Sequence, residues 1–365
     1  YLLQKLSKLI ASEMISKFFK KPNLIVGVDI GSHAVKICEL QRVGMDYKVV
    51  SVGTSLLPFG SVEDGVLQEP LAVSKILSDL LSNLKIKNKK IGISISGYSV
   101  IVKKIVLDEM NDEDLSKYIE TEAEQYVPFD LDDVYIDFQR VVKKRDTDNK
   151  CEIMLVAAKK EVVNDYLDML DQLKLQTVLV DVDGFALENI WEMTSGSNEN
   201  VALIDIGASK MNINIISEGV SVLARDVAVG SMQLTEQITN SLGVDYAEAE
   251  KIKLGIDEPG EHAEKIKAVF NKICSQWVLE IRKAIDLYLA NHPDRSLKTI
   301  VLSGGGSKVL GLGEYISKET GLKTVNFNPF ARMLYDEKRI DKKFLDSVAP
   351  EMAIAAGLAI RSTSI

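Results

Sequence analysis

The stretch Leu24-Ile-Val-Gly-Val-Asp-Ile-Gly-Ser-His-Ala-Val-Lys-Ile-Cys-Glu-Leu40 decides the fold of this chain. One apolar run ends in Asp29, Gly31 and Ser32 form a turn, and a second apolar run carries Lys36. The pattern predicts a strand, a tight turn and an antiparallel strand. The turn also suits phosphate, because glycine leaves backbone N–H groups open to an anion while the serine hydroxyl and the lysine add a donor and a charge. The carboxylate at the end of the strand can hold a hydrated Mg²⁺.

A second copy of this pattern begins about half a chain later. Asp205-Ile-Gly-Ala-Ser209 matches Asp29-Ile-Gly-Ser-His33, and in both places an apolar strand precedes the turn and an alternating strand follows it. Alone, such a turn is an ordinary connection between strands. Because it occurs twice, the sequence predicts two related α/β domains, each opening with an Asp-x-Gly hairpin.

Composition narrows the class of protein. The chain has 365 residues, is 46% hydrophobic and carries a net charge of −9, which favours a globular protein of two or more domains and argues against a nucleic-acid partner. Its three cysteines and three histidines are scattered without metal-ligand spacing, and no apolar run reaches the roughly 20 residues of a membrane span. A reducing compartment fits this cysteine usage.

The order of expected elements predicts how the domains are arranged. Between residues 98 and 170 the expected order is strand, helix, strand, strand, helix, which is typical of a compact inserted module, and Thr194–Asn200 is a polar linker. We expect an amphipathic segment at 1–21, a first domain at 22–97 and 171–198, an inserted α+β subdomain at 98–170, a second domain at 199–340, and a C-terminal helix at 341–365 that returns to the first domain.

Three glycine turns at strand ends carry the recognisable chemistry: 29–32, 205–209 and 303–307. There is no Walker A sequence, no convincing Gly-x-Gly-x-x-Gly frame and no Ser-His-Asp set. If two domains face each other, two hairpins can hold phosphates from opposite sides, and the third turn can lie beside the sugar and base. Asp29 and Asp205 would then face Mg²⁺.

These motifs resemble the actin-like ATPase superfamily and, within it, the PilM family of type IV pilus assembly. The Glu-Gln-Tyr-Val-Pro-Phe-Asp element within 122–130 is the most specific of these motifs for the PilM family, because sugar kinases of the superfamily have no counterpart to it. The residues that carry the resemblance are Val26–Ser32, Glu122–Asp130, Asp181–Leu187, Leu203–Gly207, Leu302–Leu312 and Ala349–Arg361. The resemblance implies an α/β fold of two duplicated domains with an inserted α+β subdomain, and ATP with Mg²⁺ as ligands.

The resemblance also implies roles for individual residues. Each turn would contribute one wall of the nucleotide site, and Lys251, on a charged helix with Glu248, would flank the nucleoside. The residues concerned are Asp29, Gly31, Ser32 and Lys36 in the first phosphate loop, Asp205, Gly207, Ala208 and Ser209 in the second, and Gly304, Gly305, Gly306 and Ser307 at the adenosine. Asp183–Leu187 and Ala355–Gly357 would be hinge helices.

Two positions depart from the family pattern. His33 stands where a small or hydroxyl-bearing residue is usual, which puts one phosphate contact in doubt. The hinge has Asp183-Gly184 where Glu-Pro is more usual, so a water-activating carboxylate there is uncertain. Whether the chain hydrolyses ATP, beyond weak activity, is therefore left open.

The function that the resemblance implies is a cytoplasmic ATP-binding scaffold at the inner face of the cytoplasmic membrane. Its partners would be the N-terminal tail of a PilN-like inner-membrane protein and the pilus assembly ATPase, with a homo-oligomer also possible. Tyr126, Pro128 and Phe129 would border the peptide groove, or would only end a helix and pack in a core.

Other functions stay open at this point. An FtsA-like filament-forming tether would need a membrane anchor, for which residues 1–21 are a candidate as a basic amphipathic helix. The same segment could instead pack on its own domain or be a leader. A sugar or acetate kinase-like phosphotransferase would need a catalytic Asp in a substrate cleft, and the first domain offers no obvious one.

Overall fold

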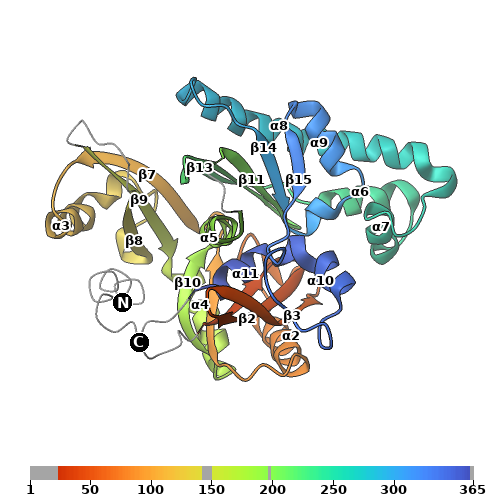
Figure 1. Ribbon diagram of the computed structural model, residues 1–365, viewed down its shortest axis with the longest axis horizontal. Coiled ribbons are helices and arrows are strands. Elements are labelled where there is room, and N and C mark those ends of the chain that lie inside the picture. The colour runs from red at the N-terminus through yellow and green to blue at the C-terminus, as the bar shows by residue number, and fades with distance from the viewer. Residues whose placement is uncertain (1–23, 142–149, 196–198, 362–365) are drawn as a thin grey trace.

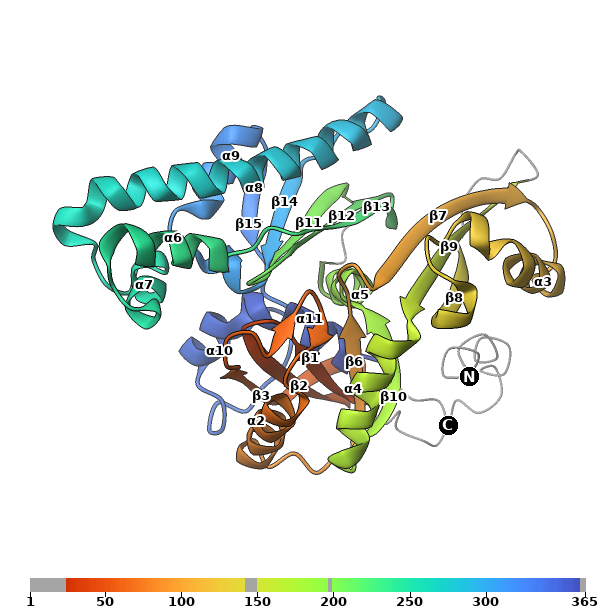
Figure 2. The same ribbon diagram turned by 180° about the vertical axis from the view of Figure 1, so that it is seen from behind.

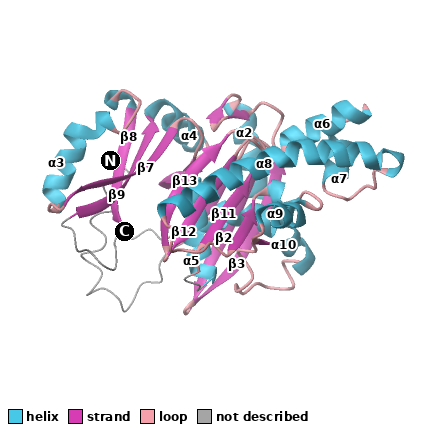
Figure 3. Cartoon of the chain, turned by 90° about the horizontal axis from the view of Figure 1, so that it is seen from above, coloured by secondary structure: helices cyan, strands magenta, loops and turns pink. Residues whose placement is uncertain are grey.

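The computed structural model describes residues 24–141, 150–195 and 199–361, and the amphipathic segment predicted at 1–21 lies outside them. In these ranges, two five-stranded sheets and one three-stranded sheet form the frame of the molecule (Figure 1). The sheet of the inserted module lies at one end, and helices α6 (Met232–Leu242) and α7 (Tyr246–Lys253) lie at the other (Figure 3).

The opening stretch forms the centre of the first sheet. As predicted, β1 pairs antiparallel with β2 across the Asp29–Ser32 turn, and it pairs on its other side, in parallel, with β6. The strand order is β10-β6-β1-β2-β3. The strands are β1 (Val26–Ile30), β2 (Ala34–Val43), β3 (Asp46–Leu56), β6 (Lys90–Ile95) and β10 (Gln176–Val182).

The second sheet repeats the topology of the first. β11 pairs antiparallel with β12 across the Asp205–Ser209 turn and in parallel with β14, and the order is β13-β12-β11-β14-β15. The strands are β11 (Val201–Ile206), β12 (Met211–Ser217), β13 (Val220–Val227), β14 (Thr299–Ser303) and β15 (Lys323–Asn326). The duplication predicted from the two Asp-x-Gly turns is therefore present in the strand order as well.

Amphipathic helices cover both sheets. Leu77 of α2 and Leu170 of α4 are completely buried against the first sheet, and Trp277 of α8 is completely buried against the second. The helices are α2 (Pro70–Asn83), α4 (Lys160–Gln172), α6 (Met232–Leu242), α7 (Tyr246–Lys253), α8 (Ala263–Asn291) and α9 (Leu312–Thr320), with a short hairpin of β4 (Val62–Glu63) and β5 (Val66–Leu67).

The inserted module stands apart from the two large sheets (Figure 2), and it has its own small core. Its sheet has the order β7-β9-β8, and Asn111 caps α3 by accepting the Asp114 backbone N–H at 2.9 Å. The elements are β7 (Val100–Asp108), α3 (Asp112–Glu122), β8 (Val134–Val141) and β9 (Lys150–Lys159). Helix α4, expected as part of this module, packs instead on the first sheet, because Val162, Tyr166 and Met169 face that core.

Helices α5 (Asp183–Ser195) and α11 (Ala353–Ala359) cross closely at the junction of the two sheets. A Cβ added at Gly357 would lie 1.9 Å from the Ala186 carbonyl oxygen, and one added at Gly27 would lie 1.9 Å from the Ala355 carbonyl oxygen. Only glycine allows these approaches. The predicted hinge segments at 183–187 and 355–357 therefore meet each other.

The last part of the predicted second domain lies against the first sheet. Leu334 exchanges backbone hydrogen bonds with Tyr47 and Val49 of β3, at 2.9 and 2.7 Å. Phe327 and Phe330 are buried in the core that also holds residues of β2 and β3. The chain thus leaves the second sheet after β15, before the predicted boundary at 340, and continues through α10 (Lys342–Val348) into α11.

Candidate functional site

The two Asp-x-Gly turns meet at the junction of the two domains. The hydroxyl oxygens of Ser32 and Ser209 lie 2.7 Å apart, although the two residues are half a chain apart in sequence. Within each turn one backbone hydrogen bond closes the loop: Gly31 N–H donates to Ala34 at 3.1 Å, and Gly207 N–H donates to Lys210 at 2.9 Å. The sequence predicted both turns, and the structure brings them into contact.

In each turn, a residue larger than glycine would bring its Cβ close to a neighbouring atom. A Cβ at Gly31 would lie 3.2 Å from Lys36 Nζ, in the space into which the ammonium projects, and one at Gly207 would lie 3.1 Å from the Lys210 carbonyl oxygen. A further hydrogen bond stabilises the second turn, because the Ala208 carbonyl accepts the Met232 N–H at 2.9 Å. Both loops are thus held in place by their own backbone contacts, and they meet through Ser32 and Ser209.

The first turn holds a buried ion pair. Lys36 Nζ lies 2.9 Å from Asp29 Oδ2, on the strand pair that flanks the turn. Burial raises the pKa of Asp29, against the opposing effect of the nearby ammonium. Both side chains were predicted from sequence, although their pairing was not.

A second ion pair crosses between the domains. Lys210 Nζ, at the end of the second turn, lies 2.8 Å from Asp183 Oδ2, at the start of α5. Burial alone would raise the pKa of Asp183, but the nearby ammonium opposes burial, and the pKa lies below its ordinary value. Lys210 was missed by sequence reasoning, since a lysine after a turn is usually solvated; its position in a second Asp-x-Gly turn was the available signal.

Asp205 has a hydroxyl for a partner instead of an ammonium. Ser303 Oγ donates to Asp205 Oδ2 at 2.7 Å. Burial raises the pKa of Asp205 to about 6, with the charges of Asp29 and Asp183 adding to the effect. Three carboxylates therefore lie near two lysines, Lys36 and Lys210, and the excess of negative charge favours a cation at this place.

This donor set fits Mg²⁺ held mainly by water. Within the described ranges, no three His, Cys, Asp or Glu side chains are grouped so as to hold a metal ion by themselves. Mg²⁺ in proteins keeps several waters and binds one or two carboxylates together with substrate phosphates. Asp29 and Asp205, at the ends of β1 and β11, are placed for that arrangement.

The third glycine turn packs directly on the second. Gly304 has φ +80°, and a Cβ there would lie 2.4 Å from the Ile206 carbonyl oxygen. Its N–H donates to Pro350 at 2.8 Å, and Ser307 Oγ donates back to the Gly304 carbonyl at 2.7 Å. Gly305 and Gly306 lie in the 3₁₀ turn Gly305–Lys308 that follows. The predicted residues thus form one tight loop beside Asp205.

Two lysines of helix α7, Lys251 and Lys253, lie in different surroundings. Lys251 is exposed, whereas Lys253 is buried and donates to Glu250 and to Thr235 Oγ1, the latter at 2.9 Å. Burial lowers the pKa of Lys253. The role of Lys251 beside a nucleoside stays a prediction. His33 lies near this helix, with its ring 6.3 Å from that of Tyr246, and burial lowers its pKa.

The predicted partner-binding residues lie on the inserted module. Tyr126 and Phe129 are half-buried against its core, and Pro128 is exposed. Lysine ammonium groups lie over both rings, Lys103 at 5.6 Å from Tyr126 and Lys159 at 5.0 Å from Phe129. Cation and ring together leave a surface with both apolar and positive character.

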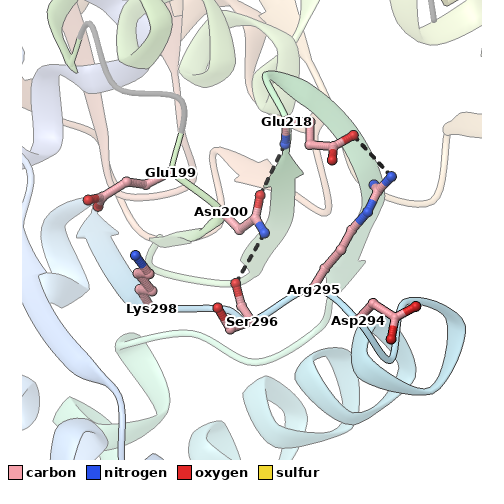
Figure 4. A pocket seen from close by; sticks show the side chains of 7 residues that line it. All are labelled: Glu199, Asn200, Glu218, Asp294, Arg295, Ser296 and Lys298. Carbon is pink, nitrogen blue, oxygen red and sulfur yellow. Dashed lines mark hydrogen bonds and ion pairs between the residues drawn. The ribbon is translucent and has the colours of Figure 1, made fainter. Parts of the chain in front are cut away.

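An open hollow of about 510 Å³ lies at the far end of β11, away from Asp205 (Figure 4). Asn200 bridges it by donating to the Ser296 carbonyl and accepting the Glu218 N–H, both at 3.1 Å, and Arg295 pairs with Glu218 at 3.0 Å. Asn200 and Arg295 thus link the ends of neighbouring strands, so we interpret the hollow as a structural feature. Among the described residues, no helix combines the length and apolar character needed to cross a membrane.

Two sheets of equal topology, whose Asp-x-Gly turns face each other, define an actin-like ATPase fold. Solved structures of this fold include the ethanolamine utilization protein EutJ from Carboxydothermus hydrogenoformans (16% identity, 98% of this chain and 97% of that chain covered, TM-score 0.56). MreB 5 of Spiroplasma citri bound to AMPPNP is a further example (13% identity, 93% and 95% covered, TM-score 0.53). The predicted fold class is confirmed.

A family model described as type IV pilus assembly protein PilM matches residues 27–363, and the chain therefore belongs to this family. A chain of a PilM-PilN type IV pilus biogenesis complex shares 24% identity, covers 93% of this chain with 98% of its own length, and has a TM-score of 0.82. The family predicted from the sequence motifs is thus confirmed.

Proposed function

We propose that this chain is an ATP-binding scaffold of the type IV pilus inner-membrane assembly platform. The observation that carries the proposal is the contact between Ser32 and Ser209, which joins the turns of two duplicated domains beside the buried Asp29 and the half-buried Asp205. Two serine hydroxyls lie there near two lysines and three carboxylates, and donors and carboxylates of this kind suit a polyphosphate with a divalent cation.

Each part of the site has a role in this proposal. The turn at 29–32 with Lys36 and the turn at 205–209 bind phosphate from opposite sides, and Gly304–Ser307 lines the adenosine. Asp29 and Asp205 hold the waters of Mg²⁺, which when bound neutralises phosphate charge. The helix with Glu248 and Lys251 flanks the nucleoside.

A PilN-like inner-membrane protein is the proposed partner. The similar chain named above comes from a PilM-PilN complex, and its likeness over nearly the whole chain supports the same kind of partner here. We place the groove for the partner's N-terminal tail beside Tyr126, Pro128 and Phe129, where it would respond to the nucleotide. The chain would then work at the cytoplasmic face of the inner membrane, next to the pilus assembly ATPase, with residues 1–21 near the lipid.

The nucleotide site is tested by titrating Mg-ATP into the full chain by calorimetry. We expect binding in the parent protein and its loss in Asp29→Ala and Gly207→Asp, since the first removes a carboxylate and the second puts a negative side chain into the phosphate turn. Asp294→Ala, at the hollow of Figure 4, is the matched control and should bind normally. Unchanged affinity in both site variants would refute the assignment.

The partner half of the proposal needs a separate measurement. A labelled synthetic peptide with the N-terminal sequence of the neighbouring inner-membrane pilus protein should bind, and Phe129→Ala should weaken binding because it removes an apolar face beside Lys159. Equal affinity for the parent and for Phe129→Ala would place the groove elsewhere. Steady-state ATP hydrolysis without partners should be slow or absent, and fast turnover with a sugar acceptor would instead favour a kinase.

A further inference from the structure

The ion pair between Lys210 and Asp183 is the starting point. Lys210 belongs to the turn of the second sheet, whereas Asp183 directly follows β10 of the first sheet and opens α5. The two side chains are 25% and 10% exposed. The ammonium is therefore paired across the domain junction, while a quarter of the Lys210 side chain is exposed.

Lys210 also lies at the wall of the proposed phosphate site. The residue before it, Ser209, contacts Ser32 of the facing turn, and the Lys210 carbonyl closes its own turn through Gly207. Lys36, the lysine of the first turn, differs in its partner, because it pairs with Asp29 inside its own sheet. Of these two lysines, only Lys210 makes an ion pair between the domains.

On the basis of the ATP site proposed above, we propose that Lys210 discriminates ATP from ADP by exchanging Asp183 for the terminal phosphate. ATP would then break the ion pair between the domains, whereas ADP would leave it intact. Lys210 would thus be a phosphate-binding residue, and Asp183 the residue that positions it in the absence of the terminal phosphate.

Competition between two anions is the physical basis of this exchange. A hydrogen bond between charged groups contributes more free energy than one between neutral groups. An ammonium can donate such a bond to a carboxylate oxygen or to a phosphate oxygen with similar geometry. Asp226 adds to the negative field around Lys210, so the ammonium stays charged in either position. Removing the ammonium should therefore weaken the binding of ATP, and removing the competing carboxylate should strengthen it.

The test measures dissociation constants of Mg-ATP and Mg-ADP by calorimetry on the full chain and on two variants. In Lys210→Met, we expect the preference for ATP over ADP to fall about tenfold or more, with ADP affinity little changed. In Asp183→Asn, which keeps the shape and removes the charge, the preference should rise. Lys298→Met, at the distant hollow of Figure 4, is the control and should keep the parent ratio.

The opposite signs of the two effects separate this inference from a structural role. If both variants lose affinity for ATP and ADP in equal proportion, or if the parent ratio persists in both, Lys210 does not read the terminal phosphate. Binding of both nucleotides by the parent with unchanged ratios in the variants would overturn this inference alone. Failure of the parent to bind either nucleotide would overturn the proposed ATP site and this inference with it.

Discussion

The carboxyl group of Asp205 lies where its ionisation lowers the stability of the folded state. Burial raises its pKa from 3.8 in the unfolded chain to about 6, even though Ser303 donates a hydrogen bond to it. Because the folded-state pKa is the higher one, the proton favours the folded state. The carboxyl costs no stability below about pH 4, the cost grows as the pH rises to about 6, and it stays constant above that.

Asp205→Asn should therefore stabilise the nucleotide-free protein at neutral pH while abolishing Mg-dependent ATP binding. The gain can reach about 3 kcal/mol, since one pKa unit corresponds to about 1.36 kcal/mol. Urea unfolding at about pH 8 should show the difference, and at about pH 4 it should vanish. A variant that is less stable than the parent at pH 8 would contradict this interpretation of Asp205.

At the residue scale, sequence reasoning identified turn residues better than it identified side-chain partners. Asp29, Gly31 and Ser32 were recognisable because turn chemistry is local. The sequence did not show whether Lys251 or Lys253 faces inward. The two lysines lie on opposite faces of a short charged helix, and no apolar periodicity indicates which face is buried. The pairing of Lys210 with a residue of the other domain depends on tertiary contacts that no local pattern encodes.

At the scale of elements, the crossing of α5 and α11 depends on the absence of side chains. Gly357 lies where an added Cβ would be 1.9 Å from the Ala186 carbonyl oxygen, a backbone atom that cannot move without displacing α5. Both helices border the domain junction, and Asp183 is the first residue of α5. The spacing of these helices thus controls how the domains are joined.

Gly357→Ala should destabilise the protein by about 3 kcal/mol or more, because overpacking against backbone forces the helices apart. Gly313→Ala is the matched control: Gly313 also lies in a helix, α9, but nothing lies within 4 Å of its added Cβ. That variant should gain about 0.5–1 kcal/mol from the lower entropy of the unfolded chain. Thermal unfolding of both variants, compared with the parent, measures these changes in stability. Equal changes in the two variants would mean that the helix crossing is not tight.

Sequence patterns identified most elements, yet they assigned some of them to the wrong neighbours. The helix at α4 was expected from its apolar stripe, but a stripe does not say which sheet it covers, and Tyr166 packs on the first sheet instead of the module. Likewise, Phe327 to Ile340 follows the second sheet in sequence but packs on β3. Local periodicity predicts a buried face, whereas the partner of that face is set by the topology.

At the scale of the whole molecule, the duplicated sheets place two equivalent turns face to face. Ser32 and Ser209 are already within hydrogen-bond distance, so a phosphate held by both turns must take the place of that hydrogen bond. The two domains therefore have to separate slightly at this point for the ligand to enter. A covalent link between the two turns should prevent this movement.

The double variant Ser32→Cys/Ser209→Cys tests that expectation. Because the two hydroxyl oxygens lie 2.7 Å apart, the introduced thiols should be close enough to form a disulfide on mild oxidation. The native cysteines Cys38, Cys151 and Cys274 are buried and should not compete. We expect the oxidised form to bind Mg-ATP at least about tenfold more weakly than the reduced form, since the domains can no longer part, and a reductant should restore binding. Each single variant should bind Mg-ATP equally well with and without the oxidant, because it cannot form the link. Undiminished binding by the oxidised double variant would show that the ligand enters without separation of the turns.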